Sequence, residues 1–247
     1  MSALARRALA SLDLTDLSDA CTFEAAANLV ARARTIHGPV AAVCLWPQYA
    51  SMARERLRGS GVAVATVINF PAGGEDIERV VDDIHEALRD GADEIDLVIP
   101  WRALKRGDER LARDMIGAAR DAIPSGRRLK TILETGELGD PDLIARASDI
   151  AIAAEADFLK TSTGKTPISA TPAAARVMLE RICASGKPVG FKASGGVRTL
   201  ADAAVYLALA DEIMGPAWAT PATFRFGASG LLDALLADIA DEPPARA

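Results

Sequence analysis

The stretch Val62-Ala-Val-Ala-Thr-Val-Ile68 decides the fold, because it is an unbroken run of small and β-branched residues. Strands of a parallel sheet that is covered on both faces read in this way. A predicted amphipathic helix follows, with an apolar face made by Ile77, Val80, Val81, Ile84 and Leu88. A second apolar run comes next, at 93–100. This order predicts a parallel strand-helix-strand unit.

The same alternation continues along the chain. After an N-terminal helical segment, eight strand-like runs are predicted, at 40–46, 61–70, 93–100, 128–134, 157–162, 188–193, 211–215 and 223–229. Two helix starts are marked by Asp140-Pro141 and Thr171-Pro172, which place a capping residue before a proline. We therefore predict an α/β protein with a single (β/α)8 TIM barrel over residues 1–240 and an extra N-terminal helical segment, followed by a flexible tail at 241–247.

Composition excludes several classes of function. The net charge is −6 with no basic block, which argues against nucleic acid or an anionic membrane as partner. Cys21, Cys44 and Cys183 form no Cys-x-x-Cys pair, which favours a reducing compartment, with the cytoplasm as the expected location. No run has the length of a membrane span, and His37 and His85 lie far apart, which argues against a histidine metal centre.

Lysine is scarce in this chain. Only six of the 28 basic residues are lysines, namely Lys105, Lys130, Lys160, Lys165, Lys187 and Lys192. Arginine serves wherever only a positive charge is needed, but it cannot lose its proton and act as an amine nucleophile. The few retained lysines therefore suggest chemistry that arginine cannot perform.

Lys130, Lys160 and Lys192 lie inside apolar strand-like runs, where a buried ammonium is costly. One such lysine is more often a snorkelling or edge residue, but three together favour a function. Lys160 and Lys192 would lie on neighbouring strands, near the C-terminal ends where barrel active sites are built. Repulsion between their ammonium groups would lower the pKa of one and give a free amine that attacks a carbonyl.

Asp96 is an acid inside the otherwise apolar run Glu94-Ile-Asp-Leu-Val-Ile99 and needs a partner. Lys130, on the next strand-like run, can supply one. The two residues either form only a buried ion pair, or Asp96 also transfers a proton during catalysis. Both interpretations can hold together.

Glycine and hydroxyl residues follow three of the predicted strands, as Thr163-Gly164-Lys165, Ser194-Gly195-Gly196 and Ser229-Gly230. Glycine lets backbone N–H groups approach an anion, and a helix start adds its dipole. Each glycine could equally serve a tight turn. Their convergence at one end of a barrel favours a phosphate site.

With these motifs, the chain resembles the deoxyribose-phosphate aldolase family, class I aldolases with a TIM-barrel fold. The resemblance covers nearly the whole chain and is most specific in Asp157-Phe-Leu-Lys-Thr-Ser-Thr-Gly-Lys165, Val189-Gly-Phe-Lys-Ala-Ser-Gly-Gly-Val-Arg-Thr199 and Phe224-Arg-Phe-Gly-Ala-Ser229. It implies reversible cleavage of 2-deoxy-D-ribose 5-phosphate to acetaldehyde and D-glyceraldehyde 3-phosphate, in deoxyribonucleotide catabolism. It implies no cofactor and no metal, and a homodimer is expected.

The resemblance also implies roles for individual residues. Lys160 would form the imine, Lys192 would tune it and relay protons, and Asp96 would manage a proton through water. The expected substrate and phosphate contacts are Thr15, Thr163, Gly164, Lys165, Gly195, Gly196, Ser229 and Gly230. Lys130, Asp13 and Cys44 would support the site, with Cys44 as a core residue rather than a nucleophile.

Three features depart from the family pattern. Ala193-Ser194 stands where many relatives have Pro-Ala, Gly230 replaces a second serine, and the tail lacks a terminal tyrosine. Other functions stay open, chiefly another Schiff-base barrel enzyme that acts on a different phosphorylated ketose or aldehyde. A barrel that binds phosphorylated metabolites without chemistry, or a metal-dependent aldolase, fits the sequence less well.

Overall fold

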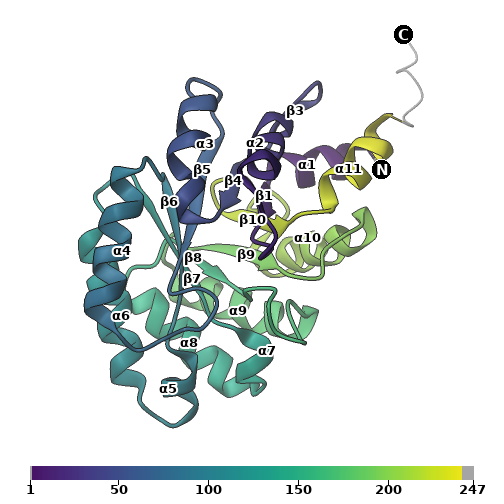
Figure 1. Ribbon diagram of the computed structural model, residues 1–247. Helices are drawn as coiled ribbons and strands as arrows, with labels where there is room; N and C mark the ends of the chain where they lie inside the picture. The colour runs from purple at the N-terminus through teal and green to yellow at the C-terminus, as the bar shows by residue number, and fades with distance from the viewer. Residues whose placement is uncertain (1, 241–247) are drawn as a thin grey trace.

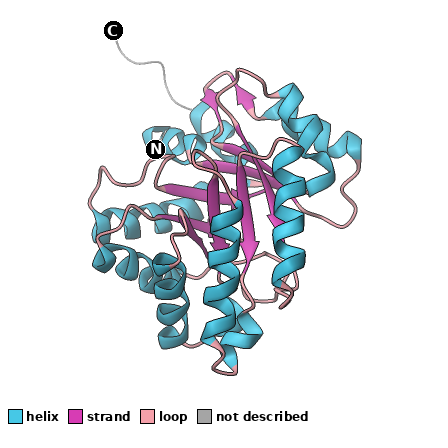
Figure 2. Ribbon diagram, turned by 90° about the vertical axis from the view of Figure 1, so that its left-hand side faces the viewer, coloured by secondary structure: helices cyan, strands magenta, loops and turns pink. Residues whose placement is uncertain are grey.

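The computed structural model describes residues 2–240, in which eight parallel strands close into a barrel. Going round the barrel, each strand pairs with the next in chain order, and the last pairs with the first. The strands are β1 (Leu12–Asp16), β4 (Ala42–Leu45), β5 (Ala63–Ile68), β6 (Glu94–Val98), β7 (Arg128–Ile132), β8 (Phe158–Lys160), β9 (Gly190–Ser194) and β10 (Phe224–Ala228). Figures 1 and 2 show these strands at the centre of the molecule.

Helices connect the strands and cover the outside of the barrel (Figure 2). They are α1 (Ser2–Ala10), α2 (Phe23–Arg32), α3 (Ala50–Arg56), α4 (Ile77–Arg89), α5 (Trp101–Lys105), α6 (Glu109–Ala122), α7 (Thr135–Leu138), α8 (Pro141–Ala153), α9 (Pro172–Ser185), α10 (Leu200–Met214) and α11 (Leu231–Ala240). The chain also forms a 3-10 helix, η1 (Pro47–Tyr49), and a small antiparallel hairpin of β2 (Arg34–Thr35) and β3 (Gly38–Pro39). Helix α1 packs against α10 and α11, next to the chain's first strand (Figure 1).

The predicted (β/α)8 barrel with an additional N-terminal helix is confirmed, but two strand positions were wrong. Residues 211–214 form the last turn of α10 and not a strand, and the first barrel strand is β1, in the region predicted as helical. Helix α10 is rich in leucine and alanine around its circumference, so its last turn reads as apolar as a strand. Strand β1 is short and interrupted by Asp13, whose side chain is buried among charges rather than in an apolar core.

The corrected count changes where the lysines lie. Lys160 is on the sixth barrel strand and Lys192 on the seventh, instead of the fifth and sixth, and they are still on neighbouring strands. Cys44 lies on the second barrel strand rather than the first. The predicted tail at 241–247 lies outside the described residues, and its separation from a domain at 1–240 stays a prediction.

Helix starts follow the predicted capping residues. The side chain of Asp140 accepts a hydrogen bond from the Asp142 N–H, and that of Thr171 accepts one from the Ala174 N–H. In both helices a proline occupies the first turn, where no intrahelical donor is needed. These caps fix where the loops above the barrel end and the helices begin.

The barrel interior differs from the layer between strands and helices. That outer layer is a continuous apolar core. The interior instead holds charged side chains that are almost completely buried, among them Asp13, Asp96, Lys130, Lys160 and Lys192. Buried charges are costly unless they are paired, so this concentration of them indicates a functional site.

Gly190 gives a test of the close packing around β8 and β9. A Cβ at this position would lie 2.4 Å from the Phe158 ring. We expect Gly190→Ala to lower the free energy of unfolding by about 1–3 kcal/mol, because the ring has to move within a packed core. Denaturant unfolding measures this change.

Gly117 in α6 supplies the matched control, since a Cβ there would meet nothing within 4 Å. Gly117→Ala is expected to leave stability unchanged or raise it by about 0.5–1 kcal/mol, as alanine favours a helix. Equal losses in the two variants would contradict the packing argument.

Candidate active site

The strand register brings the candidate catalytic side chains together. Lys160 on β8 and Lys192 on β9 are direct Cα partners, and so are Asp96 on β6 and Lys130 on β7. Lys160 is the last residue of β8, so it lies at the C-terminal end of its strand. Parallel strands with this register place the four side chains inside one barrel, near the end where loops carry substrate groups.

Asp96 is the centre of this arrangement. Its Oδ2 accepts hydrogen bonds from Lys160 Nζ at 2.7 Å and Lys192 Nζ at 2.8 Å, and its Oδ1 accepts one from Lys130 Nζ at 2.7 Å. The predicted pairing of Asp96 with Lys130 is therefore present, and the same carboxylate contacts both other lysines. One carboxylate shared by three amines cannot neutralise all of them.

A second layer of charges lies below Asp96, towards the N-terminal ends of the strands. Asp13 contacts Lys192 Nζ at 2.5 Å and Arg225 at 2.6 Å, and Glu94 contacts Lys130 Nζ at 2.6 Å and Arg225 at 3.0 Å. Glu94 and Arg225 were not singled out from the sequence. The signal that identified Asp96, a charged residue in an apolar strand, applies to both of them.

The lysine pKa values move in opposite directions. Burial lowers the pKa of the Lys160 ammonium; the Asp96 carboxylate opposes this change and Lys192 adds to it. Burial also acts on Lys192, but the carboxylates of Asp13 and Asp96 raise its pKa overall. Repulsion between the two lysines was predicted as the means of freeing an amine. It contributes in the expected direction, but burial is the larger cause.

Burial alone would raise the pKa of Asp96, but the ammonium groups of Lys130, Lys160 and Lys192 hold it well below its usual range. Asp96 is therefore a carboxylate at neutral pH. The Cys44 Sγ lies 4.0 Å from Asp96 Oδ2, and burial raises the pKa of this thiol. A neutral buried thiol is a poor nucleophile, which agrees with the interpretation of Cys44 as a core residue.

The predicted phosphate residues line one pocket of about 530 Å³ at the C-terminal end of the barrel. It is bordered by the loops that follow β1, β8, β9 and β10. All eight predicted substrate and phosphate contacts line it, namely Thr15, Thr163, Gly164, Lys165, Gly195, Gly196, Ser229 and Gly230.

Neither Lys160 nor Lys192 lines this pocket, but Lys192 lies next to its floor, and Lys160 ends β8 three residues before Thr163, which lines it. Gly227 lines the pocket, and a Cβ at Gly227 would lie 2.9 Å from Lys192 Cε and 2.7 Å from Ser194 Oγ. The absence of a side chain at Gly227 thus lets the pocket floor approach Lys192. A small molecule in the pocket could place one end near the lysines and the other among the loop glycines.

Glu134 holds the loop after β8 in place. It is not among the site residues predicted from the sequence. Its buried carboxylate accepts hydrogen bonds from the Thr163 hydroxyl at 2.5 Å and the Thr163 N–H at 3.2 Å. The Thr163 hydroxyl in turn accepts the Lys165 N–H at 3.1 Å. Glu134 has left-handed backbone angles, with φ at 56°, which are unusual for a residue other than glycine. No local pattern reveals a contact between residues 29 positions apart.

Lys165 makes an ion pair with Asp19 Oδ1 at 2.7 Å, where Asp19 is 90% exposed. Ion pairs at such exposed sites contribute little to stability. The Lys165 ammonium can therefore turn to an anion in the pocket at small cost.

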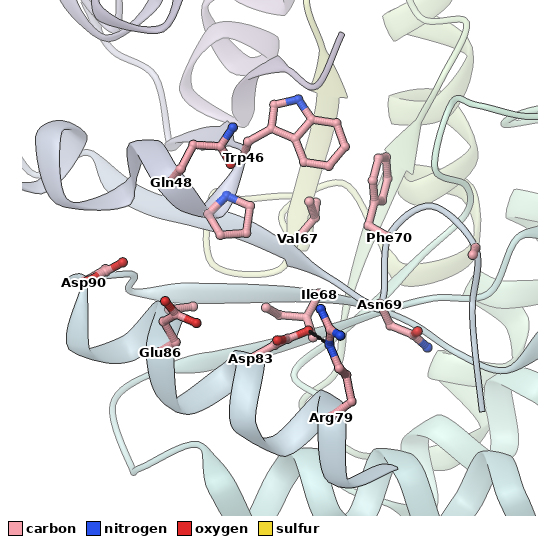
Figure 3. A pocket seen from close by; sticks show the side chains of 13 residues that line it. Trp46, Gln48, Val67, Ile68, Asn69, Phe70, Arg79, Asp83, Glu86 and Asp90 are labelled. Atoms are coloured by element: carbon pink, nitrogen blue, oxygen red, sulfur yellow. Dashed lines mark ion pairs between the residues drawn. The ribbon is translucent and has the colours of Figure 1, made fainter. Parts of the chain in front are cut away.

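A different cavity, of about 520 Å³, lies beside α4 and is shown in Figure 3. Its lining includes Trp46, Phe70 and the acids Asp83, Glu86 and Asp90. No predicted site residue lines it. Arg79 also lines it and pairs with Asp83 at 3.5 Å, which leaves the carboxylates of Glu86 and Asp90 in excess (Figure 3). This excess of negative charge disfavours a phosphorylated substrate, so we place the site at the barrel mouth.

Within residues 2–240, no group of three or more histidine, cysteine, aspartate or glutamate side chains is arranged to hold a metal ion. Over the same part of the chain, no helix is long and apolar enough to cross a membrane.

Comparisons with known proteins agree on one family. The sequence model for "DeoC/LacD family aldolase" matches residues 7–236. The chain is 51% identical, over 97% of its length and 93% of the relative's, to a deoxyribose-phosphate aldolase from Agrobacterium fabrum.

Solved structures give the same result. A Toxoplasma gondii protein solved as a candidate deoxyribose-phosphate aldolase superposes with a TM-score of 0.91 at 26% identity, covering 99% of this chain and 98% of that one. The deoxyribose phosphate aldolase from Aeropyrum pernix, described as tetrameric, has a TM-score of 0.76 at 26% identity, with 96% and 92% covered.

The buried carboxylates predict how stability depends on pH. Nearby cations lower the pKa values of Asp13, Glu94 and Asp96 against the opposing effect of burial. Such groups stabilise the fold at pH values above their unfolded pKa, about 4, and this contribution is lost as the pH falls through the folded pKa. We expect the free energy of unfolding to fall steeply below about pH 4, measured by urea unfolding across the pH range.

Asp13→Asn should show a shallower acid dependence than the wild-type chain. It should also be less stable at pH 7 by about 3–5 kcal/mol, because Lys192 and Arg225 each lose a buried partner. An acid dependence as steep as that of the wild type would contradict the role of Asp13.

Proposed function

The chain belongs to the DeoC/LacD family of aldolases, and from this premise we propose that it cleaves 2-deoxy-D-ribose 5-phosphate reversibly to acetaldehyde and D-glyceraldehyde 3-phosphate. The observation that carries the proposal is Lys160, a buried lysine with a lowered pKa that lies beneath the pocket and contacts Asp96. A lowered pKa increases the share of unprotonated amine, the form that acts as the nucleophile in a metal-independent aldolase. The Agrobacterium fabrum relative bears the name of this activity.

The reaction begins at the aldehyde carbon of the open-chain substrate. The Lys160 amine adds to this carbon, and loss of water with uptake of one proton leaves a protonated imine; the final hydrolysis returns this proton. The C3 hydroxyl then gives up its proton and the C2–C3 bond breaks, so that its electron pair moves into the imine and D-glyceraldehyde 3-phosphate leaves. The remaining enamine takes a proton at C2, and water releases acetaldehyde and the amine. The imine serves as the electron sink for the broken bond.

Asp96 and Lys192 have complementary roles in these proton transfers. Asp96 remains ionised and can orient a water molecule that carries the proton between the C3 hydroxyl and C2. Lys192 stays an ammonium because Asp13 and Asp96 both contact it. Its positive charge favours the neutral amine at Lys160 before the reaction and stabilises negative charge that develops during it.

The pocket above the lysines is suited to the phosphate. Lys165 brings a cation, and Ser229 brings a hydroxyl two residues before the start of α11, where helix N–H groups are unpaired. Gly195 and Gly196 both have positive φ, at 85° and 88°, a conformation that favours glycine. The volume of about 530 Å³ lies in the range of small-molecule sites.

The rival functions fit this arrangement less well. A barrel that only binds phosphorylated metabolites would have no need for three buried lysines around one carboxylate, since arginine binds phosphate. A Schiff-base enzyme for another sugar phosphate shares the same lysines, and only substrate comparison distinguishes it. A role in deoxyribonucleotide catabolism follows from membership of the family, whereas homodimer formation and a cytoplasmic location stay predictions.

Trapping with borohydride tests the imine directly. When the protein is reduced in the presence of acetaldehyde, we expect an ethyl group on Lys160, identified by peptide mass spectrometry. Lys160→Arg should lose the adduct and lower the cleavage rate by roughly 10³-fold or more, because arginine cannot form the imine. Lys187→Arg is the control, since Lys187 contacts the Ile152 carbonyl away from the pocket. An adduct on another lysine only would refute the proposal.

Steady-state kinetics test the phosphate end of the pocket. Ser229→Ala should raise KM for 2-deoxy-D-ribose 5-phosphate by about 10- to 100-fold, the effect of removing one hydrogen bond to a charged group. Unphosphorylated 2-deoxy-D-ribose is the control substrate, and its cleavage should be unaffected by the change. Equal effects on both substrates would place the phosphate elsewhere.

Gly230→Ser is the complementary variant. A Cβ at this position would meet nothing within 4 Å, so a serine side chain has room there. This substitution should lower KM for the phosphorylated substrate and leave kcat unchanged. An increase in KM would show that the glycine itself is needed there.

A further inference from the structure

The inside of the barrel holds an unequal number of acids and bases. Among residues 2–240, seven ionisable side chains that are each at most 4% exposed fill it and form ion pairs with one another at 3.5 Å or less. We call them the barrel cluster. Its members are the acids Asp13, Glu94 and Asp96 and the bases Lys130, Lys160, Lys192 and Arg225. Three carboxylates face four potential cations. The barrel cluster is therefore electrically neutral only when one base is uncharged.

We propose that Arg225 and Glu94, at the floor of the barrel, determine through this charge balance that Lys160 is the uncharged base. The inference deepens the proposed function, on which it rests for the role of the Lys160 amine. Both residues act as positioning residues, because neither lines the substrate pocket. They line a cavity at the opposite, N-terminal end of the barrel instead.

Contacts identify which base gives up its proton. Lys130 has carboxylate oxygens of Glu94 and Asp96 at 2.6 and 2.7 Å, and Lys192 has those of Asp13 and Asp96 at 2.5 and 2.8 Å. In the part of the chain that the structure describes, the one carboxylate that Lys160 contacts is Asp96, at 2.7 Å, and it shares this carboxylate with both other lysines. The ammonium form of Lys160 thus has the least support, and its pKa is lowered by burial while those of the other two lysines are raised by their carboxylates.

Arg225 is suited to the floor because it cannot become the neutral base. A guanidinium keeps its charge, and its planar fork bridges two carboxylates. Here one arm contacts Asp13 and the other Glu94, at 2.6 and 3.0 Å. Arg225 thereby occupies carboxylate oxygens of Asp13 and Glu94 that could otherwise stabilise another lysine ammonium group. Without Arg225, three carboxylates would face three lysines, and Lys160 would be protonated.

The ionisable groups around Lys160 come from seven of the eight barrel strands. Asp13 comes from β1, Cys44 from β4, Glu94 and Asp96 from β6, and one base from each of the last four strands, Lys130, Lys160, Lys192 and Arg225. Strand β5 carries no ionisable side chain. The Cys44 thiol is uncharged, because burial raises its pKa.

Three further basic side chains lie around the floor cavity. Arg6, His37 and Arg128 also line it. Arg128 approaches Glu94 only at 4.0 Å, and its side chain is 35% exposed, so solvent screens its charge. Arg128 therefore modifies the charge balance inside the barrel cluster less than the buried pairs do.

Two substitutions should shift Lys160 in opposite directions. Arg225→Gln removes a positive charge, so the fraction of free amine at Lys160 near neutral pH should fall by about tenfold or more. Glu94→Gln removes a negative charge, so the amine should remain free to a lower pH than in the wild type. The double variant, with both substitutions, keeps two carboxylates and three lysines, and the titration of Lys160 should return close to that of the wild type.

NMR titration of protein labelled with 13C and 15N in its lysines follows the protonation of Lys160 directly. The chain has only six lysines, and Lys160→Arg assigns the signal of Lys160. Opposite shifts in the single variants and restoration in the double variant are the expected result. Damage to packing alone would not shift the titration of Lys160 in opposite directions in the two single variants. Nor would its effects cancel in the double variant.

Shifts in the same direction, or no restoration in the double variant, would overturn the inference. If Arg225→Gln does not fold, Glu94→Gln alone still tests the inference. An unchanged or raised midpoint for the titration of Lys160 in this variant would refute the charge balance. The titration needs no aldolase turnover. A wild-type protein without a reducible acetaldehyde adduct on Lys160 would therefore refute the proposed function while leaving the charge balance measurable.

Discussion

The Asp96 carboxylate, shared by three lysine side chains inside a closed barrel, is the interaction on which the rest of the structure depends. It requires β6, β7, β8 and β9 to be adjacent and in a fixed register, since only then do the side chains meet. A closed parallel barrel supplies this register without exposed strand edges. The apolar layer outside the strands makes the fold stable, and the interior is left for charges that serve chemistry.

Most of the fold could be predicted because its signals are local. Apolar runs such as 62–68 and the caps at Asp140 and Thr171 depend on neighbouring residues only. The two errors arose where local and tertiary requirements differ. Strand β1 carries a buried acid that pairs with residues about 180 and 210 positions away, and the last turn of α10 is as apolar as a strand. Neither feature is visible in a short window of sequence.

The site divides in the same way. Lys160, Lys192 and Asp96 could be found because a charged residue in an apolar strand is unusual by itself, and the loop glycines because they repeat after successive strands. Glu94 and Arg225 carry the first signal too, yet their role became visible only when the charges of the whole interior could be counted. Glu134 carries no such signal, since its contact with Thr163 exists only once β7 and β8 are neighbours.

The uneven use of lysine and arginine has a further, practical consequence. Lys130, Lys160 and Lys192 are enclosed in the barrel, so the lysine side chains at the surface are Lys105, Lys165 and Lys187. Reagents that couple proteins to solid supports or dyes through lysine side chains thus have very few points of attachment. One of these points, Lys165, lies at the mouth of the pocket. Coupling chemistry directed at other side chains would leave this entrance unobstructed.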